Sequence, residues 1–467
     1  MRPLPPHRVA GYLAQRVRFG IKFGLGTMRA LVAEMGHPER AYPSLLIAGT
    51  NGKGSVAAYC DAALRASGLR TGRYTSPHLV RVNERITVDG RPITDAAFAR
   101  AVHEVRDAAA RLVARRVLRG HPTFFEVLTA AAFAHFRHER VDVAVLEVGL
   151  GGRLDATNVA EPAASAIVSV DLDHEIYLGR TLPKIAREKA GVLRAGRATV
   201  VGPLAPEARR AVLARARAEG ARVVEARKSA RLVPLRGKGQ RAHEAFDLRT
   251  PGHLYHHVVP LPGAHQRENL LVAIRLLEQA RRAGIPVRLE RAAQAVASVE
   301  WPGRLQRLPG RPEILLDGAH NPAGARALAA HLKGGPPFVL VFGAMADKDV
   351  RGLARPLFPL ASGIVLTTPR ISRAATPRSL ARRAGTLAAG ARHEPRVGKA
   401  LALACRLARA HGRETRVVVA GSLYLVGAVL RLKRATPRGS RSRARPAATP
   451  RRGRSPAPRA PRSSRAA

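Results

Sequence analysis

Residues 49–55, GTNGKGS, combine the residue types of a loop that binds phosphate. They stand between an apolar run and the helical stretch VAAYCDAALRASG, so backbone N–H groups and a helix N-terminus would face an anion there. Lys53 would supply positive charge for the outer phosphates, and Ser55 a hydroxyl. The spacing differs from the common G-x-x-x-x-G-K-S/T loop, because Gly54 separates these two residues. A Gly-rich turn that only caps the helix is the alternative interpretation.

Three further residues become candidates for chemistry only as a set. Glu147 lies near the end of the run VDVAVLEVG, and His174 comes soon after the run ASAIVSV. Both positions belong to the edge where open α/β sheets place their ligands. Taken alone, Glu147 would be a helix-cap acid and His174 a structural histidine. Lys189 in REKAG, taken alone, would be a solvated helix lysine.

The elements that must position these residues alternate along the chain. Short apolar runs, typical of buried strands, are separated by Ala-, Leu- and Arg-rich helical stretches. Continuous apolar strands separated by helices indicate parallel sheets that are covered on both faces. We therefore expect an α/β protein with mostly parallel sheets. The expected strands are residues 44–49, 141–149, 164–170, 198–202, 313–318, 337–343, 363–368 and 416–421.

The length of 467 residues suits two or three domains at about 100–200 residues each. We expect a change of unit near VEWPGRLQRL, where Pro302 and Gly303 stand between a helix and a new strand. The domains would then be residues 1–298 and 299–430. The remaining segment, 431–467, is rich in Ser, Pro and Arg, and we expect it to be disordered.

Two segments resemble a metal cluster and a membrane span, but their sequences favour ordinary secondary structure. HLYHHVV at 253–259 predicts an exposed antiparallel hairpin rather than a metal cluster, because no acid or cysteine joins its histidines. VVVAGSLYLVGAVL at 417–430 is shorter than the roughly 20 residues that a membrane span needs. Gly421 and Ser422 also interrupt it. It predicts a buried strand, a turn and a helix, and we expect no membrane partner.

The net charge of +47 is unevenly distributed, since residues 431–467 carry 13 Lys or Arg and no acid. Arginine far outnumbers lysine, as genomic bias toward Arg, Ala, Gly and Pro codons would produce. A polyanion-binding surface is the alternative. Aromatic residues are only 4% of the chain, whereas single-strand binding needs aromatic stacking platforms beside the basic residues. We expect no specific nucleic-acid partner, with nonspecific polyanion binding by the tail.

The two cysteines give a weak signal about compartment. Cys60 and Cys405 lie far apart and match no metal or redox spacing. This usage fits a reducing cytosol, so we expect a cytoplasmic protein. We also expect a monomer.

A series of motifs extends these signals over nearly the whole chain. In order, the chain contains GTNGKGSV, YTSPHLVRVNERI, EVGLGGRLDATN, DLDH, IAREKAG, HQRENL, WPGR, DGAHNP and DKD. As a set, they resemble the folylpolyglutamate synthase/dihydrofolate synthase family, a branch of the Mur-ligase-like ATP-dependent amide ligases. The resemblance covers about residues 10–430. It implies a P-loop-type ATPase domain and a smaller Rossmann-like α/β glutamate-ligase domain.

The resemblance implies an activity as well as a fold. Such enzymes use ATP and Mg²⁺ to phosphorylate a carboxylate, and an incoming amine then displaces phosphate from the acyl phosphate. The amine would be L-glutamate, and the acceptor dihydropteroate, a (tetrahydro)folate, or both. In this branch the shortened loop is the normal form. A Mur-type cell-wall peptide ligase and a nucleic-acid-binding NTPase are the alternatives.

The resemblance also assigns residues to roles. The catalytic positions would be Lys53, Lys189 and His320. The ATP contacts would be Thr50, Asn51, Gly52, Lys53, Gly54, Ser55, Asn269, Arg304 and Asp317. The metal positions would be Ser76, Glu147, His174 and Lys189, the last as a carbamylated lysine. The substrate positions would be Phe23, Gly24, Leu25, Thr123, Phe124, Phe125, Glu126, Leu154, Asp155 and Ala156.

Several of these assignments have ordinary alternatives. Arg304 would instead form a salt bridge in a linker. Phe124 and Phe125 would stack on a flat heterocycle or simply pack in the core. For Asp155 the resemblance implies a role in substrate binding, in which its carboxylate would accept hydrogen bonds from pterin amino groups. The DKD motif at 347–349 is typical of a helix N-cap rather than of a catalytic pair.

Overall fold

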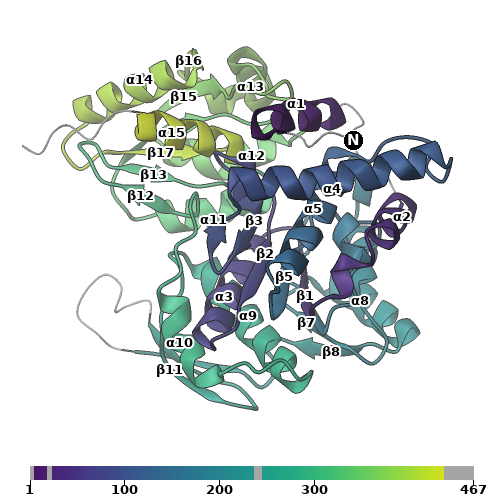
Figure 1. Ribbon diagram of the computed structural model, residues 1–467. Helices are drawn as coiled ribbons and strands as arrows, with labels where there is room; N and C mark the ends of the chain where they lie inside the picture. The colour runs from purple at the N-terminus through teal and green to yellow at the C-terminus, as the bar shows by residue number, and fades with distance from the viewer. Residues whose placement is uncertain (1–4, 18–23, 236–244, 436–467) are drawn as a thin grey trace, which may run out of the picture.

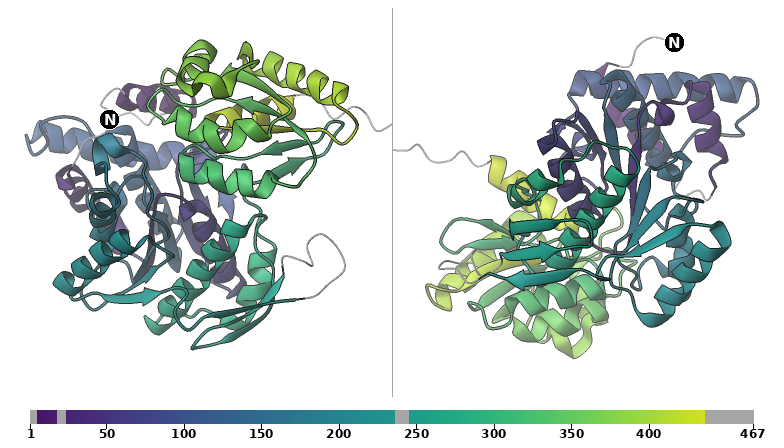
Figure 2. Two further views of the ribbon diagram at one scale, coloured as in Figure 1. Left: turned by 180° about the vertical axis from the view of Figure 1, so that it is seen from behind. Right: turned by 90° about the horizontal axis from the view of Figure 1, so that it is seen from below.

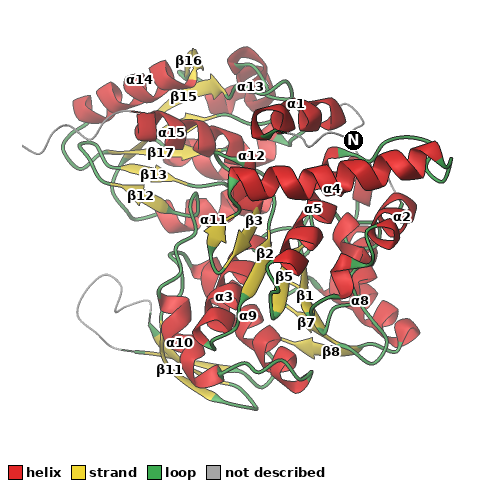
Figure 3. Cartoon of the chain, in the orientation of Figure 1, coloured by secondary structure: helices red, strands yellow, loops and turns green. Residues whose placement is uncertain are grey.

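The structure is a computed structural model that describes residues 5–17, 24–235 and 245–435 (Figure 1). The chain forms an N-terminal body, which runs as far as helix α10 (Leu289–Ala297), and a C-terminal body, which starts at strand β12 (Gln306–Leu308). Figure 2 shows the two bodies side by side from two further directions. In both bodies helices flank the strands of the main sheet (Figure 3).

The N-terminal body is built around a sheet of eight strands in the order β4-β3-β2-β5-β1-β6-β7-β8. The six strands from β2 to β8 in this order pair in parallel, and β3 and β4 add an antiparallel edge beside β2. The bounds are β1 Ser44–Ala48, β2 Thr71–Tyr74, β3 Ile86–Val88, β4 Arg91–Pro92, β5 Val143–Glu147, β6 Ala164–Ile167, β7 Ala198–Val201 and β8 Arg222–Glu225.

The central strand β1 is completely buried because its side chains alternate between two apolar cores. Leu46 and Ala48 pack into one core, and Leu45 and Ile47 into the other. The first core is covered by helices α1 Pro6–Val17, α2 Gly26–Glu34, α4 Asp95–Ala114, α5 Phe124–His138, α6 Glu175–Leu178, α7 Leu182–Lys189 and α8 Pro206–Glu219. The second is covered by α3 Lys53–Ala66, α9 Ala264–Arg282 and α10.

A small antiparallel sheet extends the second core. It has the order β11-β10-β9, with β9 at Arg231–Pro234, β10 at Phe246–Arg249 and β11 at Leu254–Val258. Residues 254–258 of the HLYHHVV motif form strand β11, which pairs antiparallel with β10, so the predicted hairpin is confirmed. Tyr255 and Val258 are buried, whereas His256 and His257 are exposed.

The C-terminal body has a six-stranded sheet in the order β12-β13-β17-β14-β15-β16, in which only the β12–β13 pair is antiparallel. One face is covered by α11 Pro322–Leu332, α12 Val350–Leu357 and α13 Pro377–Ala384. The other is covered by α14 Val397–Ala410 and α15 Leu423–Ala435. The remaining strands are β13 Ile314–Leu316, β14 Phe338–Phe342, β15 Gly363–Thr368, β16 Arg392–Arg396 and β17 Arg416–Ala420.

Each of the eight strands expected from the sequence is present, and the α/β class is confirmed. The segment 417–430 forms a strand, a turn at Gly421 and helix α15, as predicted. No helix in the described part of the chain is long and apolar enough to cross a membrane. The expected start of the tail at residue 431 falls within helix α15, which continues to Ala435. The rest of the expected tail lies outside the described residues.

Candidate active site

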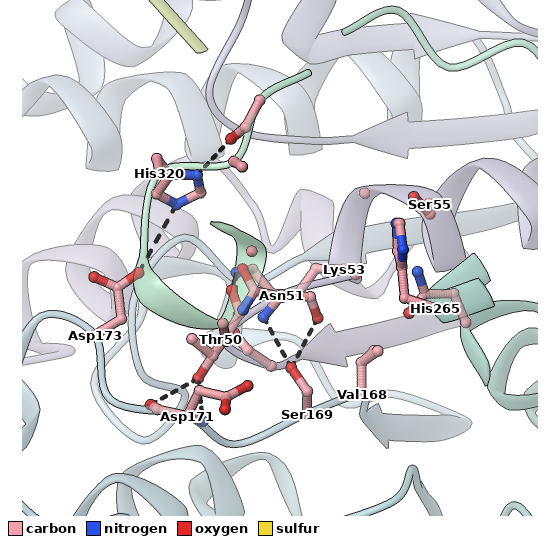
Figure 4. Close-up of a pocket in the computed structure, with 18 of the residues that line it drawn as sticks. Thr50, Asn51, Lys53, Ser55, Val168, Ser169, Asp171, Asp173, His265 and His320 are labelled. Carbon is pink, nitrogen blue, oxygen red and sulfur yellow. Dashed lines mark hydrogen bonds and ion pairs between the residues drawn. The ribbon is translucent and has the colours of Figure 1, made fainter. Parts of the chain in front are cut away.

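The phosphate-type loop lies between β1 and α3, at the carboxyl edge of the first sheet (Figure 4). Gly52 precedes the helix with φ of 84°, a left-handed conformation that glycine adopts without strain. The backbone N–H groups of Thr50 and Asn51 donate to the main-chain and side-chain oxygens of Ser169, each at 2.9 Å. Lys53 Nζ donates to a loop carbonyl 3.0 Å away. A helix start and a fixed lysine are therefore presented together, as phosphate binding requires.

Two glycines of the loop are explained by close neighbours. A side chain at Gly52 would collide with Asn269 on α9. A Cβ at Gly54 would lie 2.9 Å from the indole of Trp301, which follows α10. Gln266 on α9 also holds the loop, because its Nε2 donates to Ser55 Oγ at 3.2 Å. The loop is therefore held between α9 and the segment that connects the two bodies.

Neighbouring strands bring the three predicted metal positions of this sheet together. The strand order β2-β5-β1-β6 places the residues that follow these strands beside the loop. Ser76 follows β2, Glu147 ends β5 and His174 comes after β6; the Ser76 N–H donates to Glu147 Oε2 at 3.0 Å. Burial raises the pKa of Glu147, and burial lowers the pKa of His174 to about 4. The imidazole is therefore neutral at pH 7, as a metal ligand must be.

Lys189 is not a solvated lysine. It ends helix α7 with only 3% of its surface exposed. Burial, followed by the nearby charge of Lys53, lowers the pKa of Lys189 to about 7. A large fraction of its amine is therefore neutral at physiological pH.

The C-terminal body contributes residues from the loop after β13. Asp317 accepts hydrogen bonds from the N–H groups of Leu305 at 3.0 Å and Ala319 at 2.9 Å, so its carboxylate organises this loop. His320 Nδ1 lies 2.8 Å from Gly318 O. Burial lowers the pKa of His320 to about 4, so the ring is neutral; Nδ1 then donates to the carbonyl and Nε2 carries the lone pair.

A network that the sequence did not predict joins the two bodies at this point. Asp173 Oδ1 lies 2.6 Å from Lys348 Nζ, and its Oδ2 accepts from Asn321 Nδ2 at 2.9 Å. Asn321 also exchanges side-chain hydrogen bonds with Asn51 of the loop. His320 Nε2 lies 3.8 Å from Asp173 (Figure 4). Although burial alone would raise it, His174 and Lys348 hold the pKa of Asp173 well below its usual value.

Two cavities meet at this network. The first, about 360 Å³, lies over the phosphate-type loop, and the second, about 720 Å³, lies beside it. Ser76, His174 and His320 line both. The first is lined by all the predicted ATP contacts, which are Thr50, Asn51, Gly52, Lys53, Gly54, Ser55, Asn269, Arg304 and Asp317, and by Glu147 and Lys189. The second is lined by Gly24, Thr123, Phe124, Phe125, Glu126, Leu154, Asp155 and Ala156.

Two predicted substrate positions stand apart from this grouping. Phe23 lies outside the described residues. Leu25 is buried and does not line the second cavity, because it precedes helix α2 and packs inward. Arg304 lines the first cavity and forms no ion pair within the described residues. The linker salt bridge considered for it is therefore not present there.

The second cavity combines aromatic walls with fixed carboxylates. Phe125 is part of the packing, since it lies against Gly149 and has its ring centroid 6.0 Å from that of Tyr74. Asp155 already accepts hydrogen bonds from Thr157 N at 3.0 Å and Leu150 N at 2.9 Å. Asp155 therefore orders the loop after β5 as well as lining the cavity.

Glu126 differs from Asp155 in having one oxygen without a partner. Its Oε2 accepts from Thr123 N at 2.7 Å in a capping box at the start of α5. Its Oε1 is buried, and none of the described residues donates to it. Because a buried acceptor without a donor is unfavourable, this oxygen is suited to a donor on a bound molecule.

The donor set at the first cavity suits one kind of metal. No group of three or more His, Cys, Asp or Glu side chains that could hold a metal by itself occurs in the described ranges. Mg²⁺ is typically held by one or two carboxylates together with phosphate oxygens and water. One carboxylate, Glu147, one neutral imidazole, His174, and the hydroxyl of Ser76 beside the loop fit that pattern.

The helix N-cap prediction for DKD is also met. Asp349 is the N-cap of α12, and its Oδ1 accepts from Gly352 N at 2.9 Å. The neighbouring Lys348 was missed as part of the site because a lysine beside an N-cap predicts only a solvated charge. Asn321, in DGAHNP, was missed because its partner Asn51 is 270 residues away.

Two α/β bodies whose carboxyl strand edges share a nucleotide-type cavity define a two-domain ligase of the Mur type. The Mur ligase middle domain matches residues 47–277, and the Mur ligase glutamate ligase domain matches residues 303–423. Folylpolyglutamate synthase from Lacticaseibacillus casei is 37% identical over 405 residues, which are 85% of this chain and 92% of the relative. The chain belongs to the folylpolyglutamate synthase/dihydrofolate synthase family.

Solved structures of the family superpose over most of the chain. Folylpolyglutamate synthase from Mycobacterium tuberculosis, complexed with ADP, has a TM-score of 0.84 and 34% identity, and the match covers 91% of this chain and 98% of that one. Escherichia coli FolC, in complex with DHPP and ADP, has a TM-score of 0.80 and 27% identity, with 92% and 98% covered. The architecture inferred from the sequence is therefore that of the family.

Proposed function

We propose that this protein attaches L-glutamate to dihydropteroate, to a reduced folate, or to both, at the expense of ATP. The observation that carries the proposal is the meeting of the two cavities. The nucleotide-type loop faces one, the partly aromatic wall with Glu126 faces the other, and Ser76, His174 and His320 line both. A phosphate at the loop and a carboxylate at the end of a flat substrate would therefore meet at their junction.

The chemistry has two steps that balance. A carboxylate oxygen of the acceptor forms a bond to the γ-phosphorus of ATP, and the bond from that phosphorus to ADP breaks. The amine nitrogen of glutamate then bonds to the acyl carbon, inorganic phosphate leaves, and the amine gives up a proton. Exclusion of water from the acyl phosphate is essential, which is a reason for a site that closes between two domains.

Individual residues would contribute as follows. Lys53 neutralises the charge that develops on the outer phosphates. Arg304 reaches the same cavity from the connecting segment, and Asn269 and Asp317 shape its walls. His320 offers Nε2 as a hydrogen-bond acceptor at the junction of the cavities, since its Nδ1 is committed to Gly318 O.

Ser76, Glu147 and His174 would hold Mg²⁺, which supplies charge neutralisation at the phosphates when bound. Lys189 would be carbamylated: its neutral amine nitrogen bonds to the carbon of CO₂ and releases one proton, which leaves an anionic oxygen ligand. The support is burial to 3% exposure and the pKa of Lys189 near 7, which keep part of the amine unprotonated.

The acceptor would lie in the 720 Å³ cavity, between Phe124, Leu154 and Ala156. Glu126 Oε1 would accept from N–H groups of the pterin ring, and Asp155 would hold the neighbouring loop. Phe124 is also within 5.3 Å of the Arg85 guanidinium, which leaves one of its faces for a ligand ring or for packing. Gly24 and Thr123 complete the wall on the side of α2 and α5.

The broader setting also stays a proposal. We place the domain boundary near residue 299, and we expect a cytoplasmic monomer with a basic tail that binds polyanions nonspecifically. Both cysteines are free, as a reducing compartment would leave them. Light scattering at several concentrations tests the monomer, and heparin retention with and without residues 436–467 tests the tail.

The deciding experiment measures ADP release by purified protein with ATP, Mg²⁺ and glutamate, and compares dihydropteroate with tetrahydrofolate as the acceptor. We expect release that requires both glutamate and at least one acceptor. Release with one acceptor alone would assign the enzyme to that reaction. A rate of ADP release that neither acceptor changes and that DNA or RNA increases would instead favour the nucleic-acid-binding NTPase.

A further inference from the structure

The only tryptophan of the chain lies where the two bodies are connected, between α10 and β12. Its indole packs against Gly54, the residue that separates Lys53 from Ser55; a Cβ at Gly54 would lie 2.9 Å from Trp301 Cζ2 and 3.2 Å from Nε1. Gly54 is a helical residue and does not have a positive φ. Glycine is therefore needed at this position for the indole and not for the backbone.

A cation also contacts the indole. The Arg73 guanidinium carbon lies 5.1 Å from the centroid of the Trp301 ring, within the range of a cation–π contact. Arg73 Nη1 in turn donates to Asp61 Oδ2 at 3.0 Å, and Asp61 is completely buried on α3. The indole thus packs against residues of both α3 and β2.

The turn that begins at Trp301 leads directly to the first cavity. Arg304 N donates to Trp301 O at 3.3 Å, so the two residues are the ends of one closed turn. Arg304 lines the nucleotide cavity. Within the same turn, the carbonyl of Gly303 accepts from Gly318 N at 2.8 Å, which ties the turn to the loop that carries Asp317. The turn is therefore attached to the N-terminal body by the indole and to the C-terminal body by Gly303.

We propose that Trp301 is a positioning residue for the ligation. Its indole docks the connecting turn on the start of helix α3 at Gly54 and thereby holds Arg304 in the nucleotide cavity. The inference rests on the proposed function for its activity readout. It also explains why the loop reads G-K-G-S: a side chain between Lys53 and Ser55 would displace the indole.

A double-mutant cycle tests the proposal. Trp301→Ala should lower kcat/KM for ATP about tenfold or more in the otherwise unchanged enzyme, and by less than about twofold in an Arg304→Ala background. Trp301→Phe should retain most of the activity, because a flat ring still fits against Gly54. Val299→Ala, which removes apolar contact from the same connecting segment and the same core, is the matched control and should behave as the wild type.

Equal losses from Trp301→Ala in both backgrounds would overturn the proposal, because the tryptophan would then act independently of Arg304. So would a loss in Val299→Ala as large as in Trp301→Ala, since that would indicate a merely structural role. Thermal melts of every variant separate loss of fold from loss of positioning, and Trp301→Phe carries the test if Trp301→Ala fails to fold: inactivity of a well-folded Phe variant contradicts the proposal.

A second measurement separates this proposal from the proposed function. Because Trp301 is the only tryptophan, its emission reports on the Gly54 surface in the full-length protein without any acceptor. Titration with a non-hydrolysable ATP analogue should shift the emission in the wild type, and Arg304→Ala should reduce the shift severalfold. If no folate acceptor supports turnover but this pattern holds, the function is wrong and the positioning role stands. An unchanged emission at saturating nucleotide contradicts the positioning role.

Discussion

Asn51 and Asn321 exchange hydrogen bonds between their side-chain amides, one on the phosphate-type loop and the other at the start of α11 in the C-terminal body. Asn321 Nδ2 donates to Asn51 Oδ1 at 3.0 Å, and Asn51 Nδ2 donates to Asn321 Oδ1 at 3.3 Å. Asn321 is also the N-cap of α11, with Oδ1 accepting from Gly324 N. The loop is therefore hydrogen-bonded directly to the C-terminal body through this amide pair.

Replacement of the phosphate and metal positions should abolish ligation without unfolding the protein. We expect Lys53→Ala, Glu147→Ala and His174→Ala each to lower turnover at least about 100-fold, because each removes charge or a ligand where charge develops. Steady-state ADP release measures the effect, and circular dichroism checks the fold. Normal turnover in any one variant would refute the role assigned to that residue.

Lys348→Met should destabilise the protein strongly. The side chains of Lys348 and Asp173 are only 10% and 7% exposed, and their ion pair spans 2.6 Å. Removal of one partner leaves a buried charge uncompensated, which costs about 3–5 kcal/mol. Urea unfolding measures the change. Lys399→Met, at an exposed position of α14, is the control and should stay within about 0.5 kcal/mol of the wild type.

The Lys348 result can be checked with a compensating change. The pair Lys348→Met and Asp173→Asn removes both charges, so it should recover part of the lost unfolding free energy. A Lys348→Met protein as stable as the wild type would show that Asp173 does not depend on this lysine.

Lys189→Ala should be inactive, and added acetate or formate should restore part of its turnover. The small carboxylate would enter the space left by the lysine side chain and supply the anionic oxygen that the carbamate supplies in the wild type. Lys184→Ala, an exposed lysine of the same helix, should be fully active and indifferent to acetate. A crystal structure with bound nucleotide and an unmodified Lys189 would contradict the carbamate, and so would Lys189→Ala at full activity.

Glu126→Gln should weaken acceptor binding more than catalysis. Glutamine can keep the capping box with Thr123, but it can place an amide donor where Glu126 Oε1 now has no partner. Loss of one hydrogen bond to a ligand should raise KM for the acceptor about tenfold with kcat nearly unchanged. Glu290→Gln, at an exposed position of α10, is the control. An unchanged KM for the acceptor would remove Glu126 from the binding site.

Much of the fold could be predicted because most of its central strands coincide with short apolar runs of the sequence. Runs such as residues 44–49 and 337–343 are continuously apolar, and only a strand covered on both faces buries every residue of such a run. Strand β2, TGRY, was not predicted: it has a glycine and an arginine at its centre, and it is stabilised by its neighbours β3 and β5 rather than by its own apolar character.

The residues of the site also fall into those that the sequence indicates and those whose contacts only the structure shows. Motif order sufficed to assign Lys53, Glu147 and His174, because loop glycines and strand ends are local features. The motifs also indicate Lys189, but only the structure shows its burial, which brings its pKa near 7 and comes from elements packed around α7. Gln266 and Lys348 stand in the motifs HQRENL and DKD, but their partners could not be predicted, because Ser55 and Asp173 are 211 and 175 residues away.

By itself, the sequence determined the class of fold, the phosphate-type loop and the family, since these depend on short runs and on the order of motifs. Only the tertiary structure decided why Gly54 stands between Lys53 and Ser55, and which residues of the C-terminal body reach the loop. The physical reason is that an indole against a glycine, and an amide pair between Asn51 and Asn321, exist only once the two bodies are packed together.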